Sequence, residues 1–371
     1  MPSIKQAPPR WRVADVVRLH GDDVRRGVSL LHRQRCALDD IERCRTAALG
    51  GHRELYECGH IVTAYNSCRS RCCPQCVGSK SRDWVEQKEQ DLLPIPYFHV
   101  VFTLPPELVD VPPMARPAVY EALFHAAGQT LLKFGRRDLG GQIGFLAVLH
   151  TWGQTLTHHP HVHCVVAGGA FNTQSKTWKS ARPGFLFPVR ALSKVFRGKM
   201  LAILRRRGLP GVEPERLAAI VGAAAGREWV VYAKRPFGGP EQVLRYLARY
   251  THRIAIGEHR LVNVDDDGVT FTYRDYRDDS AQKTMTLAGG EFLRRYLQHV
   301  LPRGFTRLRS FGFLANNGKH EKLAAIRTIL GAETPAPTKV RECLCPFCGV
   351  GVLVDRQLLE PWTLLPRRDT S

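Results

Sequence analysis

The stretch His158-His159-Pro160-His161-Val162-His163-Cys164-Val165 decides how we interpret this chain. Its second half alternates polar and apolar residues, and alternate residues of a β-strand point to opposite faces of a sheet. We therefore predict that His161 and His163 project together from one face, while Val162 and Cys164 face a core. Two imidazoles rooted about 7 Å apart, twice the rise per strand residue, are able to bind one divalent cation.

The residues before this strand indicate its partner. Residues 143–154 are largely apolar and predict a second strand, joined to the first by a short polar turn. Counting back through this turn places Gln154 opposite His161 on the same face, where it would supply an oxygen ligand. Two imidazoles and one oxygen favour Mg²⁺ or Mn²⁺ with bound waters over a closed zinc site. The alternative is a surface strand with two incidental histidines.

Further strand and helix patterns surround this pair. The continuous apolar run at residues 97–104 predicts a buried strand, and Asp265-Asp266-Asp267-Gly268 predicts the turn of a hairpin over residues 261–276. Another strand is expected at 229–234, and helices are expected at 117–134, 191–207, 215–225, 241–253 and 291–300. Because no βαβ rhythm runs through the chain, we predict an α+β fold with a largely antiparallel sheet flanked by helices.

The helix expected over residues 241–253, EQVLRYLARYTHR, carries a pair of tyrosines. Tyr246 and Tyr250 are four residues apart and therefore lie one turn apart on the same side. Cations beside a phenol stabilise the nucleophilic phenolate, and this helix has a basic face built by Arg245, Arg249 and Arg253. Tyr246 lies nearer to that face, so we expect it to attack first. The alternative is a pair of structural tyrosines between core and solvent.

The charge of the chain points to a polyanionic partner. Lys and Arg total 54 against 34 Asp and Glu, which gives a formal net charge of +20 and favours nucleic acid as the partner. We find no signal-peptide pattern and no apolar run near the roughly 18 residues that cross a bilayer. We therefore expect no membrane association and a cytoplasmic location. The eleven cysteines then favour metal sites over disulfides.

Most of the cysteines lie near the N-terminus, where their spacing predicts a zinc site. Cys73-Pro-Gln-Cys76 has the form of a tight knuckle, and tetrahedral Zn²⁺ needs four ligands. The expected quartet is Cys58, Cys68, Cys73 and Cys76, and His52, His60, Cys44 and Cys72 are further candidate ligands. A second knuckle, Cys343-Leu-Cys345-Pro-Phe-Cys348-Gly, is followed by no further Cys or His, so its metal binding stays open.

Changes in composition divide the chain into three expected domains. A zinc-binding DNA-recognition domain spans residues 1–92, before the sequence turns apolar near Leu93-Pro-Ile-Pro. A catalytic domain spans residues 93–300 and includes a helical insertion at 170–228. A C-terminal segment, 301–371, holds a Pro/Thr-rich linker and the second cysteine knuckle.

In this order the motifs resemble the HUH rolling-circle transposases of bacterial insertion sequences, of the IS91 type with an N-terminal zinc-binding domain. The stretches that carry the resemblance are residues 44–52, 65–76, 96–105, 149–169, 246–256 and 301–316. The sequence departs from the family pattern twice, with Leu55 at an expected cysteine and Cys72 at an expected histidine. The identity of one zinc ligand is therefore open.

The resemblance implies a fold, an activity and site residues. It implies an HUH endonuclease palm in which His161 and His163 bind the metal and Tyr246 and Tyr250 are catalytic. It also implies that single-stranded and hairpin DNA at the element ends is nicked and transferred to target DNA through 5′-phosphotyrosine intermediates.

Two other classes of protein compete with this interpretation. A plasmid replication initiator or conjugative relaxase would use the same chemistry, often with a helicase domain that does not fit within 371 residues. A catalytically silent zinc-finger DNA-binding regulator would have lost the histidines or the tyrosines, and all four are present. The sequence specifies no oligomeric state.

Overall fold

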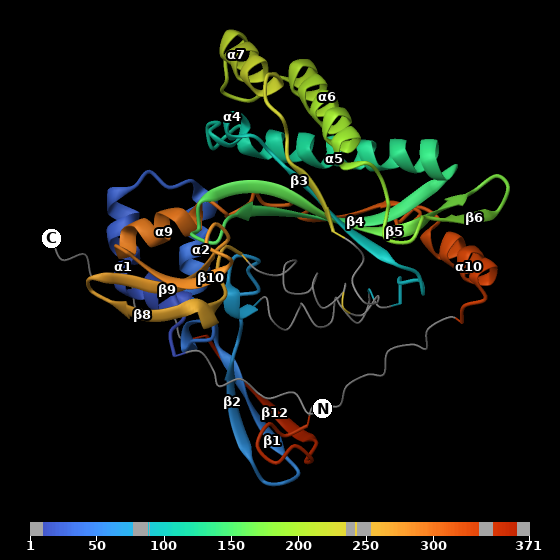
Figure 1. Ribbon diagram of the computed structural model, residues 1–371. Coiled ribbons are helices and arrows are strands. Elements are labelled where there is room, and N and C mark those ends of the chain that lie inside the picture. Colours follow the sequence, from blue (N-terminus) through green and yellow to red (C-terminus); the bar gives the residue numbers. More distant parts are fainter. Residues whose placement is uncertain are drawn as a thin grey trace.

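The computed structural model describes residues 10–76, 88, 90–234, 242, 254–333 and 344–361. A six-stranded antiparallel sheet lies at its centre, with strand order β11-β4-β5-β3-β7 and with β6 paired to β5 (Figure 1). The strands are β3 (Tyr97–Thr103), β4 (Gln142–Trp152), β5 (His158–Asn172), β6 (Thr177–Ser180), β7 (Val231–Lys234) and β11 (Leu308–Gly312). The predicted α+β class with an antiparallel sheet is confirmed.

Helices cover one face of this sheet. The long helix α5 (Arg116–Leu139) lies on β4 and β5, and α6 (Val189–Arg207) packs on α5 (Figure 1). Gly128 lets α5 lie close to the sheet, because a Cβ there would meet the Phe311 ring at 2.7 Å. Two more helices, α4 (Pro106–Val109) and α7 (Pro214–Ala225), lie beside them. The helices expected in the 170–228 insertion therefore exist, and their apolar faces belong to the largest core of the protein.

A second layer joins the N-terminal helices to a later part of the chain. Helices α1 (Val13–Gly27) and α2 (His32–Arg43) pack together, and α1 also packs on α9 (Gly289–Leu297). Beside α9 lies a three-stranded sheet of β8 (Leu261–Asp265), β9 (Gly268–Asp275) and β10 (Ala281–Leu287). Asp265 pairs with Gly268, so the predicted hairpin turn is confirmed. The third strand, β10, was not expected.

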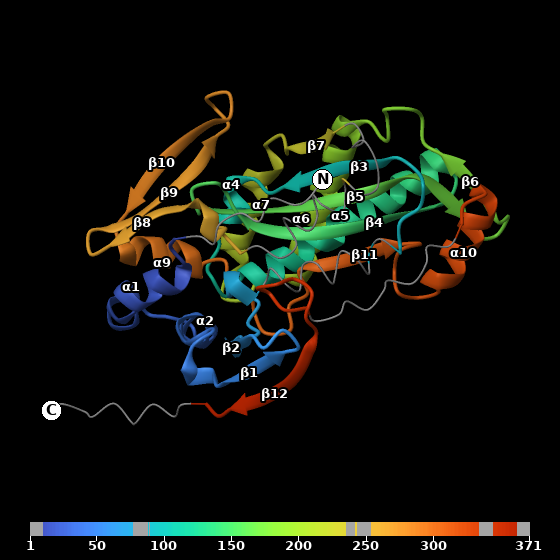
Figure 2. The same ribbon diagram turned by 90° about the horizontal axis from the view of Figure 1, so that it is seen from below.

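The two ends of the described chain meet in a third sheet. Strand β12 (Leu353–Leu359) pairs with β1 (Gly51–Tyr56), which pairs with β2 (Ile61–Tyr65) (Figure 2). The remaining elements are η1 (Ala47–Leu49), η2 (Glu258–Arg260) and α10 (Lys319–Leu330). Within the described ranges, no helix is both long and apolar enough to span a membrane. The domain boundaries stay a prediction, although packing brings parts of the first and third expected domains together.

Candidate functional site

Strand β5 carries a row of histidines on the sheet face opposite α5, the face turned toward the viewer in Figure 2. Val162 and Cys164 belong to the core under α5, so the predicted division of this strand between two faces is confirmed. His161 and His163 lie on the other face together with His150 of β4. One ring nitrogen from each of these three histidines lies within 4.8 Å of the others. This set is called the histidine cluster below.

The register of the hairpin decides the third member of the histidine cluster. His150 pairs directly with His161, so the predicted pairing of Gln154 with His161 is wrong. Strand β4 ends at Trp152, and Gln154 lies in the loop that follows. The Gln154 amide instead contacts the end of β9, where the Arg274 N–H donates to Oε1 at 3.4 Å, and Nε2 donates to the hydroxyl of Tyr276 just beyond it at 3.3 Å. The prediction failed because it placed the turn at residues 155–160, whereas the turn lies at residues 153–157 and the pairing is irregular beside His150.

Hydrogen bonds to the other ring nitrogens orient the histidine cluster. His161 Nδ1 lies 2.7 Å from the carbonyl oxygen of His159. A carbonyl only accepts, so Nδ1 carries the proton and Nε2 keeps a lone pair. His163 Nδ1 lies 2.8 Å from His99 Nε2 on β3. A metal-bound histidine commonly donates its second ring N–H in this way, which fixes the ring and its tautomer. Sequence reasoning missed His99, whose only signal was a histidine within the apolar run of residues 97–104.

Burial keeps these rings in the form that binds metal. Desolvation lowers the pKa of both His161 and His99 to about 4, and it lowers the pKa of His163 well below its ordinary value. The imidazoles are therefore neutral at pH 7, as metal ligands must be.

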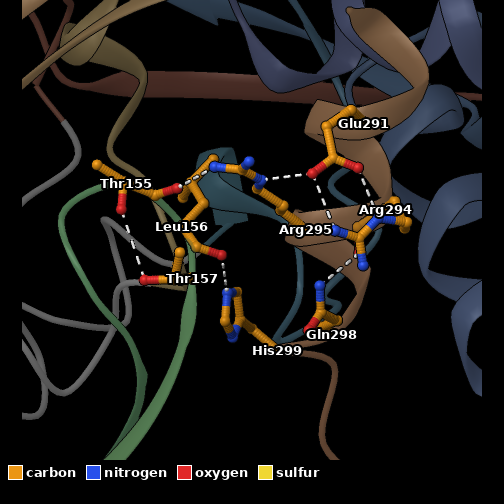
Figure 3. A network of polar contacts seen from close by, with 8 residues as sticks. All are labelled: Thr155, Leu156, Thr157, Glu291, Arg294, Arg295, Gln298 and His299. Carbon is orange, nitrogen blue, oxygen red and sulfur yellow. Dashed lines mark hydrogen bonds and ion pairs between the residues drawn. The ribbon is translucent and has the colours of Figure 1, made fainter. Parts of the chain in front are cut away.

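Helix α9 holds the loop of the histidine hairpin in place (Figure 3). His299 Nε2 donates to the carbonyl oxygen of Leu156 at 3.1 Å, and Arg295 donates to that of Thr155 at 3.1 Å. Glu291 orients Arg295 through a 2.6 Å ion pair. Leu156 has a positive φ of 61° and is fully buried in the core beside α9. A residue other than glycine adopts this conformation only where its surroundings enforce it, so α9 fixes the shape of the loop.

Four cysteines form a separate cluster at the end of α2. They are Cys44, Cys68, Cys73 and Cys76, and their sulfur atoms lie within 4.8 Å of one another. Three of the four are buried, in a core shared with α1, α9 and Leu156. Four thiolates at one point are the ligand set of a closed, structural zinc site. We call this set the buried quartet.

The buried quartet differs from the expected one in one member. Cys58 was expected here, but it lies at the tip of the β1–β2 hairpin near Cys345 and Cys348. Cys44, which follows the last residue of α2, takes its place. Spacing along the chain did not reveal that the hairpin carries Cys58 away.

Three further residues considered as zinc ligands lie outside the buried quartet. The Cys72 side chain is hydrogen-bonded to Ser70 and lies near Arg307. His52 pairs with Glu54 on β1, and the His60 ring stacks on Phe347. These three side chains therefore contact other residues and do not belong to the group of four converging sulfur atoms.

The predicted catalytic helix lies outside the described residues, with Tyr246, Tyr250, Arg245, Arg249 and Arg253. The described chain before it reaches Lys234, which pairs with His99 in the sheet. After it the chain resumes at Ile254, which is buried in the same core as Leu156. Both flanks of the tyrosine segment are therefore attached to elements that support the histidine cluster.

Known proteins match this chain over almost its whole length. Residues 144–322 match a family model described as "Putative transposase", and residues 16–104 match the "Transposase zinc-binding domain" of the IS91 type. The "Putative transposase y4qJ" of Sinorhizobium fredii is 43% identical, over 97% of this chain and 98% of that protein. The chain belongs to the IS91 family of transposases. The transposase therefore has a zinc-binding domain, and the buried quartet lies within it.

Two further comparisons differ in strength. The transposase for insertion sequence element IS801 of Pseudomonas savastanoi pv. phaseolicola is 31% identical, over 80% of this chain and 73% of that protein. A metal-bound structure of the conjugative relaxase TrwC with oriT DNA is 12% identical and covers 61% of this transposase and 90% of that chain, with a TM-score of 0.27. That TM-score is too low to carry an argument about function.

Proposed function

We propose that this transposase nicks single-stranded DNA at the ends of its insertion sequence and transfers the cut strand to target DNA, by metal-assisted attack of a tyrosine. One observation carries the proposal: three histidine nitrogens from two adjacent strands converge to within 4.8 Å on a single face of the sheet. Incidental histidines would not converge in this way with the outer nitrogens of His161 and His163 already hydrogen-bonded. The family assignment favours transposition over plasmid replication or conjugation.

The donor set of the histidine cluster fits a borderline divalent cation. His150, His161 and His163 supply three imidazoles and no oxygen, and imidazole prefers softer ions than Mg²⁺. We therefore propose that Mn²⁺ supports the reaction better than Mg²⁺. When bound there, the cation would polarise the phosphodiester that is cut. The histidines would hold that charge on the face of the sheet opposite α5, and His99 orients His163.

The nucleophile we propose is Tyr246, with Tyr250 as the second. The phenolic oxygen bonds to phosphorus while the bond from phosphorus to the 3′ oxygen breaks, and the proton lost by the phenol balances the one gained by the 3′ oxygen. The resulting 5′-phosphotyrosine retains the energy needed for rejoining, so no nucleoside triphosphate is consumed. Arg245, Arg249 and Arg253 would favour the phenolate and bind phosphates. Attachment of both flanks of this segment near His99 and Leu156 supports this assignment.

Two tyrosines suit strand transfer, because the second cleavage must occur while the first 5′ end is still covalently held. The high positive charge suits the DNA partners we propose, namely single-stranded and hairpin DNA at the element ends and the target strand. Association with the nucleoid would follow from the same charge.

A nicking assay with matched variants tests the histidine cluster. Purified protein is incubated with single-stranded DNA from the ends of its own element, with Mn²⁺, with Mg²⁺ or with EDTA. We expect cleavage with Mn²⁺, weaker cleavage with Mg²⁺ and none with EDTA. His150→Ala should reduce the cleavage rate by at least about a hundredfold, whereas Gln154→Ala, the matched control, should leave it within about twofold. Equal activity of the two variants would refute the histidine cluster, and a loss only in Gln154→Ala would restore the original ligand prediction.

A further inference from the structure

A third group of metal-ligating side chains brings the two ends of the chain together. Cys58 comes from the tip of the β1–β2 hairpin, and Cys345 and Cys348 come from the turn that precedes β12. Their sulfur atoms lie within 4.8 Å of one another, although about three hundred residues separate Cys58 from Cys345. We call this set the terminal trio. It shares no residue with the buried quartet or the histidine cluster.

The loop around Cys345 and Cys348 has the backbone of a metal knuckle. The Gly349 N–H donates to the Cys345 carbonyl at 2.9 Å, and Gly349 has a positive φ of 75°. The Gly351 N–H donates to Cys348 Sγ at 3.3 Å. Such N–H bonds stabilise a thiolate, the form in which cysteine binds metal.

The loop at Cys58 repeats half of this arrangement. Cys58 is also followed by a glycine of positive φ, Gly59 at 78°, whose N–H donates to the Tyr56 carbonyl at 2.8 Å. The His60 N–H donates to the Cys58 sulfur. If Leu55-Tyr-Glu-Cys58-Gly59 is aligned with Cys345-Pro-Phe-Cys348-Gly349, Leu55 takes the position of Cys345. One loop therefore offers two thiols and the other offers one.

Contacts between the two loops hold the sulfur atoms together. The Glu57 N–H donates to the Val352 carbonyl at 3.0 Å, and the His60 ring stacks on Phe347 with centroids 4.2 Å apart. A Cβ at Gly351 would lie 3.1 Å from Cys58 Sγ, so the missing side chain allows the sulfur to approach. The backbone therefore holds the thiols at one point before any ion binds, which reduces the entropy lost on binding.

We infer that Cys58, Cys345 and Cys348 bind a second zinc ion, which fastens β12 and the C-terminal knuckle to the zinc-binding domain. Zn²⁺ takes four ligands, and the aligned loops place Leu55 where a fourth thiolate would stand. A site with three thiolates, two of them exposed, exchanges its ion more readily than the closed buried quartet does. The ion would thus link the two ends of the chain reversibly.

Zinc stoichiometry of the full-length protein tests this inference. Metal analysis of the reduced protein should find about two zinc ions per chain beyond any cation at the histidine cluster. Cys348→Ser should lose one and keep the other, because the buried quartet is intact. Hydrogen exchange at residues 353–359 should become faster in this variant, since β12 loses its attachment. One zinc ion in the unchanged protein, or a disulfide within the terminal trio, would overturn the inference.

A substitution that should raise the affinity for zinc supplies a second test, because a gain of affinity cannot result from a destabilised fold. Leu55→Cys should complete a four-thiolate site and slow the release of the second zinc to a chelator by at least about tenfold. Leu358→Cys is the matched control, because it adds an exposed thiol to β12 away from the trio and should change nothing. Cobalt substitution should show a second four-thiolate site, in addition to the buried quartet, only in Leu55→Cys. Equal zinc release from the two variants would show that Leu55 does not face a metal.

Discussion

The histidine hairpin reaches the core of the buried quartet through Leu156, but the two clusters are built in opposite ways. The three histidines come from one hairpin, on two paired strands that α5 supports from behind. The four cysteines come from the end of α2 and from the loop after β2, and three of them are themselves part of the core. Strand pairing and packing against α5 stabilise the sheet without an ion, whereas the loop around the buried quartet has little regular structure of its own. A cation at the histidine cluster would therefore serve chemistry, whereas a zinc ion at the buried quartet would serve folding.

Exchanging one ligand in each site should separate these roles most clearly. Cys73→Ser should lower the free energy of unfolding by more than about 3 kcal/mol, because binding of a structural zinc ion contributes directly to folding. His161→Ala should change it by less than about 1 kcal/mol and yet abolish DNA cleavage. Denaturant unfolding and the nicking assay, run on both variants, measure the two quantities. If His161→Ala unfolds as readily as Cys73→Ser, the division of roles is wrong.

A smaller effect should come from His99, which orients His163 without belonging to the histidine cluster. His99→Phe removes the acceptor for the Nδ1–H of His163 and should weaken cation affinity by about 10- to 100-fold. His99→Gln keeps an acceptor oxygen and should recover part of that loss. The readout is the Mn²⁺ concentration that gives half-maximal cleavage, with the rate at saturating Mn²⁺ changing less. Equal affinity in both variants would mean that His99 acts only by filling space.

Stability should also depend on pH, through the loop that joins the two strands of the histidine hairpin. Burial lowers the pKa of His299 to about 4, from an unfolded value near 6.5. The folded state therefore holds this ring neutral, so its stabilisation is complete above pH 6.5 and is lost as pH falls toward 4. The loss amounts to about 3 kcal/mol at most, at 1.36 kcal/mol per pKa unit. Stability measured against pH checks the slope.

The matched variant for that measurement is His299→Gln, which retains an N–H donor for the Leu156 carbonyl but does not titrate. Subtracting its stability curve from that of the unchanged protein removes the contribution of the other histidines. We expect the advantage of the unchanged protein to shrink between pH 6.5 and 4. A constant difference would show that His299 is not held neutral by the fold.

Local patterns were sufficient where each residue's role depends on its neighbours in sequence. Alternation along residues 161–164 predicted which side chains of β5 face α5, because the two-residue period of a strand is a property of the backbone itself. The same holds for the turn at Asp265–Gly268 and for the helices α5, α6, α7 and α9. Motif order also led to the correct family.

Only the tertiary structure decided which residues of separate segments meet. His150 replaced Gln154 because the position of the turn and an irregularity set the register, and a shift of a few residues costs little in local propensity. Cys44 replaced Cys58 because the β1–β2 hairpin extends its tip toward β12, a contact between the two ends of the chain. The sequence by itself therefore determined the kinds of ligand and the faces they occupy. Their grouping into three sites depends on long-range packing, which spacing along the chain does not encode.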